Sequence, residues 1–216
     1  MANDALYRRV AELHIANINQ GFLATLGVGF LAQMYRAIDE GQGSALLVAK
    51  EGDHIIGFVA AGCGMRPIYL RMLWRWPQLF AALLPALLSP RRVWRILEIL
   101  RYSSNGSARG ASALPEAELL SIAVDAGVRG QGHADALYRS LCARLTSHDV
   151  LAFKIVVGAA LAPAHRFYLR MGAEPVARTE VHRGEISTVY VQQIPLGKAK
   201  QPDKSEHVCR LTNEES

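Results

Sequence analysis

The chain has 216 residues, of which 50% are hydrophobic and 20% are charged, and this balance suits one globular domain with a substantial core. The formal net charge of +5 is uneven, because residues 66–101 hold seven arginines and a single glutamate while the rest of the chain has 17 basic and 18 acidic residues. A single local basic segment argues against nucleic-acid binding, and the longest apolar run, residues 79–88, is broken by Pro85 and too short to span a bilayer.

Three cysteines, Cys63, Cys142 and Cys209, lie far apart and form no Cys-x-x-Cys pair. This pattern argues against a disulfide framework and against a cysteine-built zinc site, and it favours a reducing compartment. No other spacing of His, Cys, Asp and Glu suggests a metal site. The N-terminus lacks the basic-then-apolar order of a secretory signal, so we expect a cytoplasmic protein.

The first 60 residues predict two helices and a hairpin. Asn3 and Asp4 are typical N-cap residues, and the apolar spacing after them predicts a first helix. A second helix is predicted over about 29–39. Two apolar runs, 45–49 and 55–60, are separated by a Gly-Asp turn, which predicts two antiparallel strands.

The basic segment 66–101 is expected to be a helical insertion between two core strands. Its prolines divide it into short helices, and it carries all three tryptophans of the chain. Three uses fit this composition: a lid over the acceptor pocket with arginines for a phosphate or carboxylate, a peripheral contact with an anionic membrane, and a homodimer contact.

The second half of the chain alternates strands and helices. A strand is predicted over 118–125, followed by a turn at 130–132 and a helix to about 145. The apolar run 150–157 predicts a strand buried on both faces. Pro163 opens a further helix, which Gly172 ends.

A closing hairpin of 175–182 and 186–194 completes the predicted domain, and the polar segment 197–216 is expected to be a disordered tail. The order of elements indicates an α/β or α+β fold in a single domain over residues 1–196.

The most informative stretch is the strand that enters the glycine-bearing turn Arg129-Gly-Gln-Gly-His-Ala134 and then a helix. Such a turn directs free backbone N–H groups, at the positive end of the helix dipole, toward a diphosphate. The Walker pattern is absent, and the dinucleotide fingerprint fails because Asp135 stands where its third glycine should be. A third known phosphate-loop pattern, Arg/Gln-x-x-Gly-x-Gly/Ala, matches this turn at every fixed position. In this stretch the sequence resembles the GNAT superfamily of acetyl-coenzyme A-dependent N-acetyltransferases.

A second stretch adds to the resemblance. The family's Asn-x-x-Ala-x-x-x-Tyr helix corresponds to Leu161 through Tyr168, which keeps Ala164 and Tyr168 and then reaches Gly172. Leu161 replaces the usual Asn, so a polar contact to the cofactor arm is lost or supplied elsewhere. The resemblance implies a mixed, mostly antiparallel central sheet flanked by helices, with acetyl-CoA as co-substrate.

The resemblance also implies roles for particular residues. The backbone of Ile122, Ala123 and Val124 would bind the pantetheine arm of the cofactor, with Leu161 near it. The diphosphate would be bound by the loop residues Arg129, Gly130, Gln131, Gly132, His133, Ala134 and Asp135.

Two residues are candidates for the chemistry. Glu118 stands eleven positions before Arg129, as the general base does in histone-modifying members of the family. Period-2 alternation places Glu118 on one strand face with Leu120, Ile122 and Val124, where apolar neighbours would raise its pKa. Glu116 could compete for this role, and Glu118 could instead be an exposed acid.

Tyr168 would donate a proton to the departing thiolate, as in the family, or it could simply pack in the core. His133 and His165 also lie within the motifs, but their variable helix positions predict solvated side chains rather than bases.

The sequence therefore predicts an N-acetyltransferase that moves an acetyl group from acetyl-CoA to a primary amine, on a small molecule such as an amino sugar. Two alternatives stay open: a non-catalytic coenzyme A-binding module, and a longer-chain acyltransferase at a membrane surface.

Overall fold

A computed structural model describes residues 2–18, 22–74, 114–182 and 185–195. The predictions for most of the basic segment, for the turn at residues 183–184, for the tail and for Cys209 lie outside these residues. Cys63 is disulfide-bonded, which differs from the expectation of no disulfides, whereas Cys142 is free. Within the described ranges, no helix combines the length and the apolar character needed to cross a membrane.

The described elements alternate in the predicted order. In chain order they are α1 (Ala2–Asn17), η1 (Phe22–Leu26), α2 (Gly27–Asp39), β1 (Ser44–Glu51), β2 (His54–Gly62), α3 (Arg66–Trp74), β3 (Glu118–Val124), η2 (Ala126–Val128), α6 (His133–Thr146), β4 (Ala152–Gly158), α7 (Ala162–Arg170), β5 (Glu174–His182) and β6 (Glu185–Gln193). Both predicted hairpins form, as β1 with β2 and as β5 with β6.

The start of α1 differs from the prediction. The helix begins at Ala2, so Asn3 and Asp4 lie in its first turn instead of capping it. The Asp4 carboxylate accepts a hydrogen bond from Arg36 Nη1 of α2 at 2.8 Å. The acidic side chain therefore joins two helices and also lies at the favourable, positive end of the α1 dipole.

The six strands form one mixed sheet in the order β1-β2-β3-β4-β6-β5. Every neighbouring pair is antiparallel except β3 and β4, which run parallel at the centre of the sheet. The two parallel strands are paired only where Glu118 meets Lys154 and Leu119 meets Ile155. Beyond Leu119, the edge of β3 that faces β4 is therefore not bonded to that strand.

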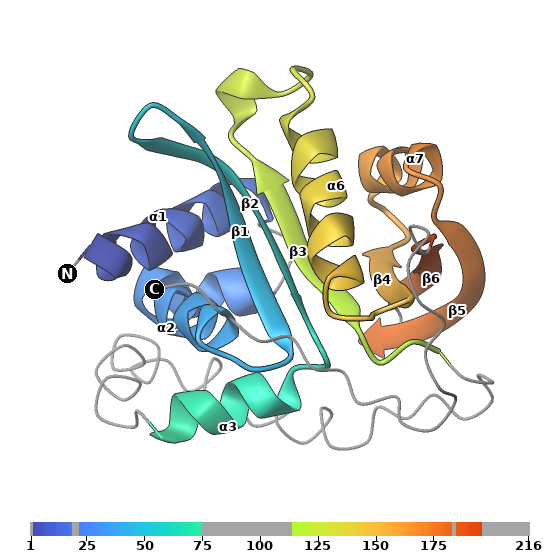
Figure 1. Ribbon diagram of the computed structural model, residues 1–216, viewed down its shortest axis with the longest axis horizontal. Helices are drawn as coiled ribbons and strands as arrows, with labels where there is room; N and C mark the ends of the chain where they lie inside the picture. Colours follow the sequence, from blue (N-terminus) through green and yellow to red (C-terminus); the bar gives the residue numbers. More distant parts are fainter. Residues whose placement is uncertain (1, 19–21, 75–113, 183–184, 196–216) are drawn as a thin grey trace.

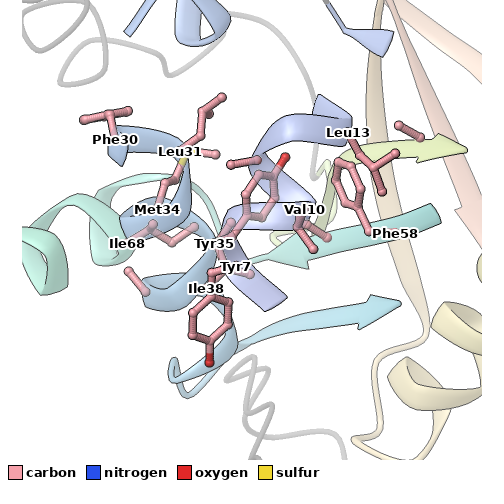
Figure 2. Packing of buried hydrophobic residues seen from close by; sticks show 14 of the residues in the cluster. Tyr7, Val10, Leu13, Phe30, Leu31, Met34, Tyr35, Ile38, Phe58 and Ile68 are labelled. Carbon is pink, nitrogen blue, oxygen red and sulfur yellow. The ribbon is translucent and has the colours of Figure 1, made fainter. Parts of the chain in front are cut away.

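Helices cover both faces of the sheet (Figure 1). On one face, α1 and α2 pack on β2, and α3 packs against α2, in a core that contains Tyr7, Leu13, Tyr35 and Phe58 (Figure 2). On the other face, α6 and α7 pack in a second core that extends across β4 and β6. The apolar stripe predicted for 134–145 is the face that α6 buries.

Strand β4 is not buried on both faces, contrary to the prediction. Phe153, Ile155 and Val157 are buried in the core beneath α6, whereas Val156 between them is 36% exposed. The core beneath α1 and α2 contains no buried residue of β4. The continuous apolar run thus misled the prediction, because the described helices that cover this central strand lie on one side of it.

A bulge in β3 changes the face on which Glu118 lies. Ala60 pairs with Ser121 and Ala61 with Leu119, so the pairing skips Leu120. As a result, Leu120 packs toward α1 and α2, while Ile122 packs in the core beneath α6. The predicted shared face of Glu118 with Ile122 and Val124 is therefore wrong, since strict alternation does not pass through a bulge.

Candidate active site

The connection from β3 to α6 is held in place by the Asp125 side chain within it and by Arg9 of α1. Asp125, the residue after β3, accepts a hydrogen bond from the backbone N–H of Gly127 at 3.1 Å, which starts the short helix η2. Its other carboxylate oxygen lies 3.1 Å from Arg9 Nη2 of α1. The same arginine donates to the carbonyl of Ile55 at 3.2 Å. Arg9 therefore ties the loop to the first hairpin.

The loop before α6 has the backbone shape that an anion site requires. Gly130 and Gly132 have φ angles of +80° and +85°, a region that L side chains rarely adopt. Gly132 is the N-cap of α6, and no side chain caps this helix end. The first N–H groups of α6 are therefore available to a ligand at the positive end of the helix.

A cavity of about 630 Å³ joins this loop to β3 and α7. Its volume lies within the range typical of small-molecule sites. Its lining consists of Asn17, Ile122, Ala123, Val124, Val128, Arg129, Gly130, Gly132, His133, Ala134, Asp135, Pro163, Ala164, Phe167, Tyr168 and Arg170.

Most residues predicted to bind the cofactor thus lie around one cavity, and three predicted site residues lie outside its lining. Gln131 is exposed in the loop, and Leu161 is the N-cap of α7 with 36% of its surface exposed. Glu118 is at the opposite end of β3 from the loop.

Asn17 was missed by the sequence analysis, because nothing local marks the last residue of α1 as part of a site. Its Oδ1 accepts a hydrogen bond from Arg129 Nη2, and its Nδ2 donates to the carbonyl of Leu13 at 2.8 Å. The end of α1 therefore orients the one arginine of the loop that faces the cavity.

Arg170 of α7 was also missed. Its guanidinium binds both carboxylate oxygens of Asp135 on α6, at 2.5 and 2.9 Å, and lies 5.5 Å from the centre of the Phe167 ring. The hydrogen bond from Arg170 lowers the pKa of Asp135, which is therefore ionised at neutral pH. This pair joins α6 to α7 at the rim of the cavity and offsets the negative charge of Asp135 there.

Tyr168 lies at the buried end of the cavity lining. Its side chain is 6% exposed and its ring contacts those of Tyr138, Phe167 and Tyr190. Burial raises the pKa of Tyr168, so the phenol keeps its proton. Within the described part of the chain its hydroxyl has no hydrogen-bond partner, and it can therefore donate to a ligand.

Glu118 is the first residue of β3, where that strand still pairs with β4, and it lies on the sheet face away from α6. Its carboxylate is 3.6 Å from Lys154 Nζ, and each side chain is 24% exposed. Burial raises the pKa of Glu118, although Lys154 opposes this shift. The group is a carboxylate that binds a proton more readily than an exposed glutamate does.

His165 is not the solvated side chain that was predicted. Its Nδ1 lies 2.7 Å from the hydroxyl of Tyr190, and its Nε2 lies 3.1 Å from the carbonyl of Gly158. These bonds join α7 to the end of β4 and to the middle of β6. Among the described residues, no group of His, Cys, Asp and Glu is arranged to hold a metal ion.

The cavity suits an elongated ligand that carries a diphosphate. The loop glycines and the uncapped end of α6 offer backbone donors that can bind phosphates, and Arg129 can add a positive charge. Along Ile122–Val124, the free edge of β3 can pair with an amide-bearing chain as a neighbouring strand would. Pantetheine has such amides.

Comparison with known proteins gives a consistent result. The sequence model of the acetyltransferase (GNAT) family matches residues 15–173. No curated protein matches the chain.

Several solved structures share the fold. A protein from Desulfovibrio desulfuricans that is assigned to the GNAT acetyltransferases has a TM-score of 0.54 at 16% identity, over 89% of this chain and 92% of its own. Protein smu.2055 of Streptococcus mutans UA159 has a TM-score of 0.52 at 17% identity, over 89% and 96%. PH1933 from Pyrococcus horikoshii OT3 has a TM-score of 0.51 at 12% identity, over 87% and 89%.

Proposed function

Because the chain belongs to the GNAT family of acetyltransferases, we propose that it transfers an acetyl group from acetyl-CoA to a primary amine at the cavity between β3, α6 and α7. The observation that carries this proposal is the continuity of the cavity. One space connects the phosphate-binding loop, the free edge of β3 and the buried hydroxyl-bearing Tyr168.

Acetyl-CoA would supply an acetyl group activated as a thioester. Arg129 and the backbone from Gly130 to Asp135 would bind its diphosphate, and the Ile122–Val124 edge would bind its pantetheine arm. These contacts orient the acyl end toward Tyr168, whose retained proton suits a donor to the leaving thiolate.

Glu118 is proposed as the base that removes a proton from the acceptor amine, directly or through water. Its position outside the cavity lining supports an acceptor that approaches from the face of the sheet opposite α6. Its raised pKa supports the same role, because a base works best when its pKa is near the working pH.

The acceptor is proposed to be a small molecule, with an amino sugar as the first class to test, and the enzyme is proposed to work in the cytoplasm. The membrane contact and the homodimer considered for the basic segment stay predictions, since residues 75–101 lie outside the described part of the chain.

The deciding experiment is release of free thiol from acetyl-CoA by the purified protein with a panel of amino sugars, polyamines, amino acids and peptides. Release that depends on one amine class supports the proposal and names that class. A parallel series with longer acyl-CoA donors tests the longer-chain alternative. Absence of coenzyme A binding in calorimetry would contradict the assignment of the cavity.

Changing Asn17 to Ala is expected to weaken acetyl-CoA binding about three- to tenfold, since the guanidinium of Arg129 loses the amide that orients it. Isothermal titration calorimetry measures this change. Asn3→Ala, at the exposed start of the same helix, is the matched control and should bind as the wild type does. Tighter binding by the Asn17 variant would mean that Asn17 holds Arg129 away from the diphosphate.

A further inference from the structure

Helix α7 carries the proposed proton donor and buries a single side chain. It has nine residues, and Tyr168 is the one among them that is buried. Its N-cap, Leu161, makes no side-chain hydrogen bond, and a helix of this length is not stable by itself. The position of Tyr168 therefore depends on the bonds that hold α7 beside α6 and the sheet (Figure 1).

Polar side chains attach α7 to α6 and to the sheet. At the end of the helix Arg170 binds Asp135 of α6, and in its middle His165 binds the sheet. His165 Nδ1 lies 2.7 Å from the hydroxyl of Tyr190 on β6, and its Nε2 lies 3.1 Å from the carbonyl oxygen of Gly158 on β4. Because a carbonyl oxygen can only accept, Nε2 carries a proton, and in the neutral ring Nδ1 accepts a hydrogen bond from Tyr190. One imidazole thus joins α7 to two strands.

The hydrogen bond from Tyr190 also affects which phenol of the aromatic cluster is free to donate. The ring centroids of Tyr138 and Tyr190 lie 6.2 and 6.3 Å from that of Tyr168. The hydroxyl of Tyr138 donates to Gln192, and that of Tyr190 donates to His165. Both of these protons are therefore engaged, whereas the Tyr168 hydroxyl has no partner among the described residues and belongs to the cavity lining.

We propose that His165 is a positioning residue for the acetyl transfer: it fixes α7 against β4 and β6 and engages the hydroxyl of Tyr190, so that Tyr168 is the phenol presented to the leaving thiolate. The inference rests on the proposed function, since it takes Tyr168 as the proton donor. His165 is not part of the cavity lining, so it acts on the reaction through Tyr168.

The test replaces His165 by Phe, which keeps a ring of similar size but removes both hydrogen bonds. We expect kcat to fall about tenfold, which is less than the loss expected on removing the Tyr168 hydroxyl itself. The dissociation constant of acetyl-CoA should change less than about threefold, because the proposed diphosphate loop precedes α6 and keeps its contacts.

Arg166→Gln is the matched control. Arg166 is the next residue of α7, is exposed and is not part of the cavity lining. Its replacement should leave both kcat and the dissociation constant unchanged.

The decisive measurement is a double-variant cycle with Tyr168→Phe. If His165 positions the Tyr168 hydroxyl, adding His165→Phe to Tyr168→Phe should lower kcat no further, because that hydroxyl is already absent. A change that merely loosens the fold would lower kcat by the same factor in both backgrounds. Nitrogen NMR of the His165 side chain gives a second readout: Nε2 should carry the proton, Nδ1 should carry none, and the Nδ1 signal should shift in Tyr190→Phe.

A kcat that His165→Phe leaves unchanged, or lowers equally with and without the Tyr168 hydroxyl, would overturn the inference. A proton on Nδ1 with none on Nε2 would overturn it as well. If Tyr168→Phe lowers kcat while His165→Phe does not, the proposed function stands and the positioning role alone fails. If the wild type binds no coenzyme A and releases no thiol with any amine, the proposed function itself fails.

Discussion

Replacing Tyr168 by Phe is expected to lower kcat about 100-fold while the affinity for acetyl-CoA stays within about twofold. The phenylalanine keeps the ring that contacts Tyr138, Phe167 and Tyr190, so the shape of the cavity is preserved. It removes the one hydroxyl proposed to protonate the leaving thiolate. Because burial raises the pKa of Tyr168, the donor stays protonated and should add no alkaline limb to the pH–rate profile at ordinary working pH.

Tyr138→Phe is the matched control for this prediction. Tyr138 belongs to the same aromatic cluster and is buried, but its hydroxyl donates to Gln192 Oε1 at 2.9 Å and it is not part of the cavity lining. Steady-state kinetics and calorimetry on both variants separate a catalytic hydroxyl from a packing one. A kcat that falls equally in the two variants would assign Tyr168 to packing.

Glu118→Gln is expected to lower kcat by a similar factor, about 100-fold, and to remove the acid limb of the pH–rate profile. A base must be deprotonated to work, so the wild-type rate should fall as the pH drops through the pKa of Glu118. Burial raises that pKa above its ordinary value, and the limb should therefore lie at higher pH than an exposed glutamate would give. The amide cannot accept the proton at any pH.

Glu116→Gln is the control here, because Glu116 is an exposed acid two residues away. It should leave both kcat and the acid limb unchanged. Glu118→Gln also leaves Lys154, which is 24% exposed, without its partner, so thermal unfolding of the variant should be measured to separate a loss of stability from a loss of catalysis. If the Glu116 variant loses the acid limb and the Glu118 variant keeps it, the base has been assigned to the wrong glutamate.

Tyr168→Phe and Glu118→Gln change residues on opposite faces of the central strands. Tyr168 belongs to the core beneath α6 and α7, whereas Glu118 and Lys154 lie on the other face of the sheet. The proposed proton donor, Tyr168, and the proposed proton acceptor, Glu118, would therefore act from different faces of the sheet. Cofactor binding should accordingly be insensitive to Glu118→Gln.

Local features of the sequence were sufficient to predict the loop that defines the family. The strand, the glycine turn and the amphipathic helix lie between residues 118 and 146. Each of them is determined by residues that are close together in the sequence. Positive φ angles at Gly130 and Gly132, and the apolar stripe of α6, follow from side-chain size and helical period alone. Both hairpins were predictable for the same reason.

The sequence by itself thus determined the family, the order of the elements and the loop proposed to bind the diphosphate. Tertiary structure decided which distant side chains complete the site: Asn17 meets Arg129 across 112 positions, and Arg170 meets Asp135 across 35. It also decided the face of Glu118, because the bulge at Leu120 arises from pairing with β2, and the partners of His165. These features depend on how the elements pack, and local periodicity carries no information about packing partners.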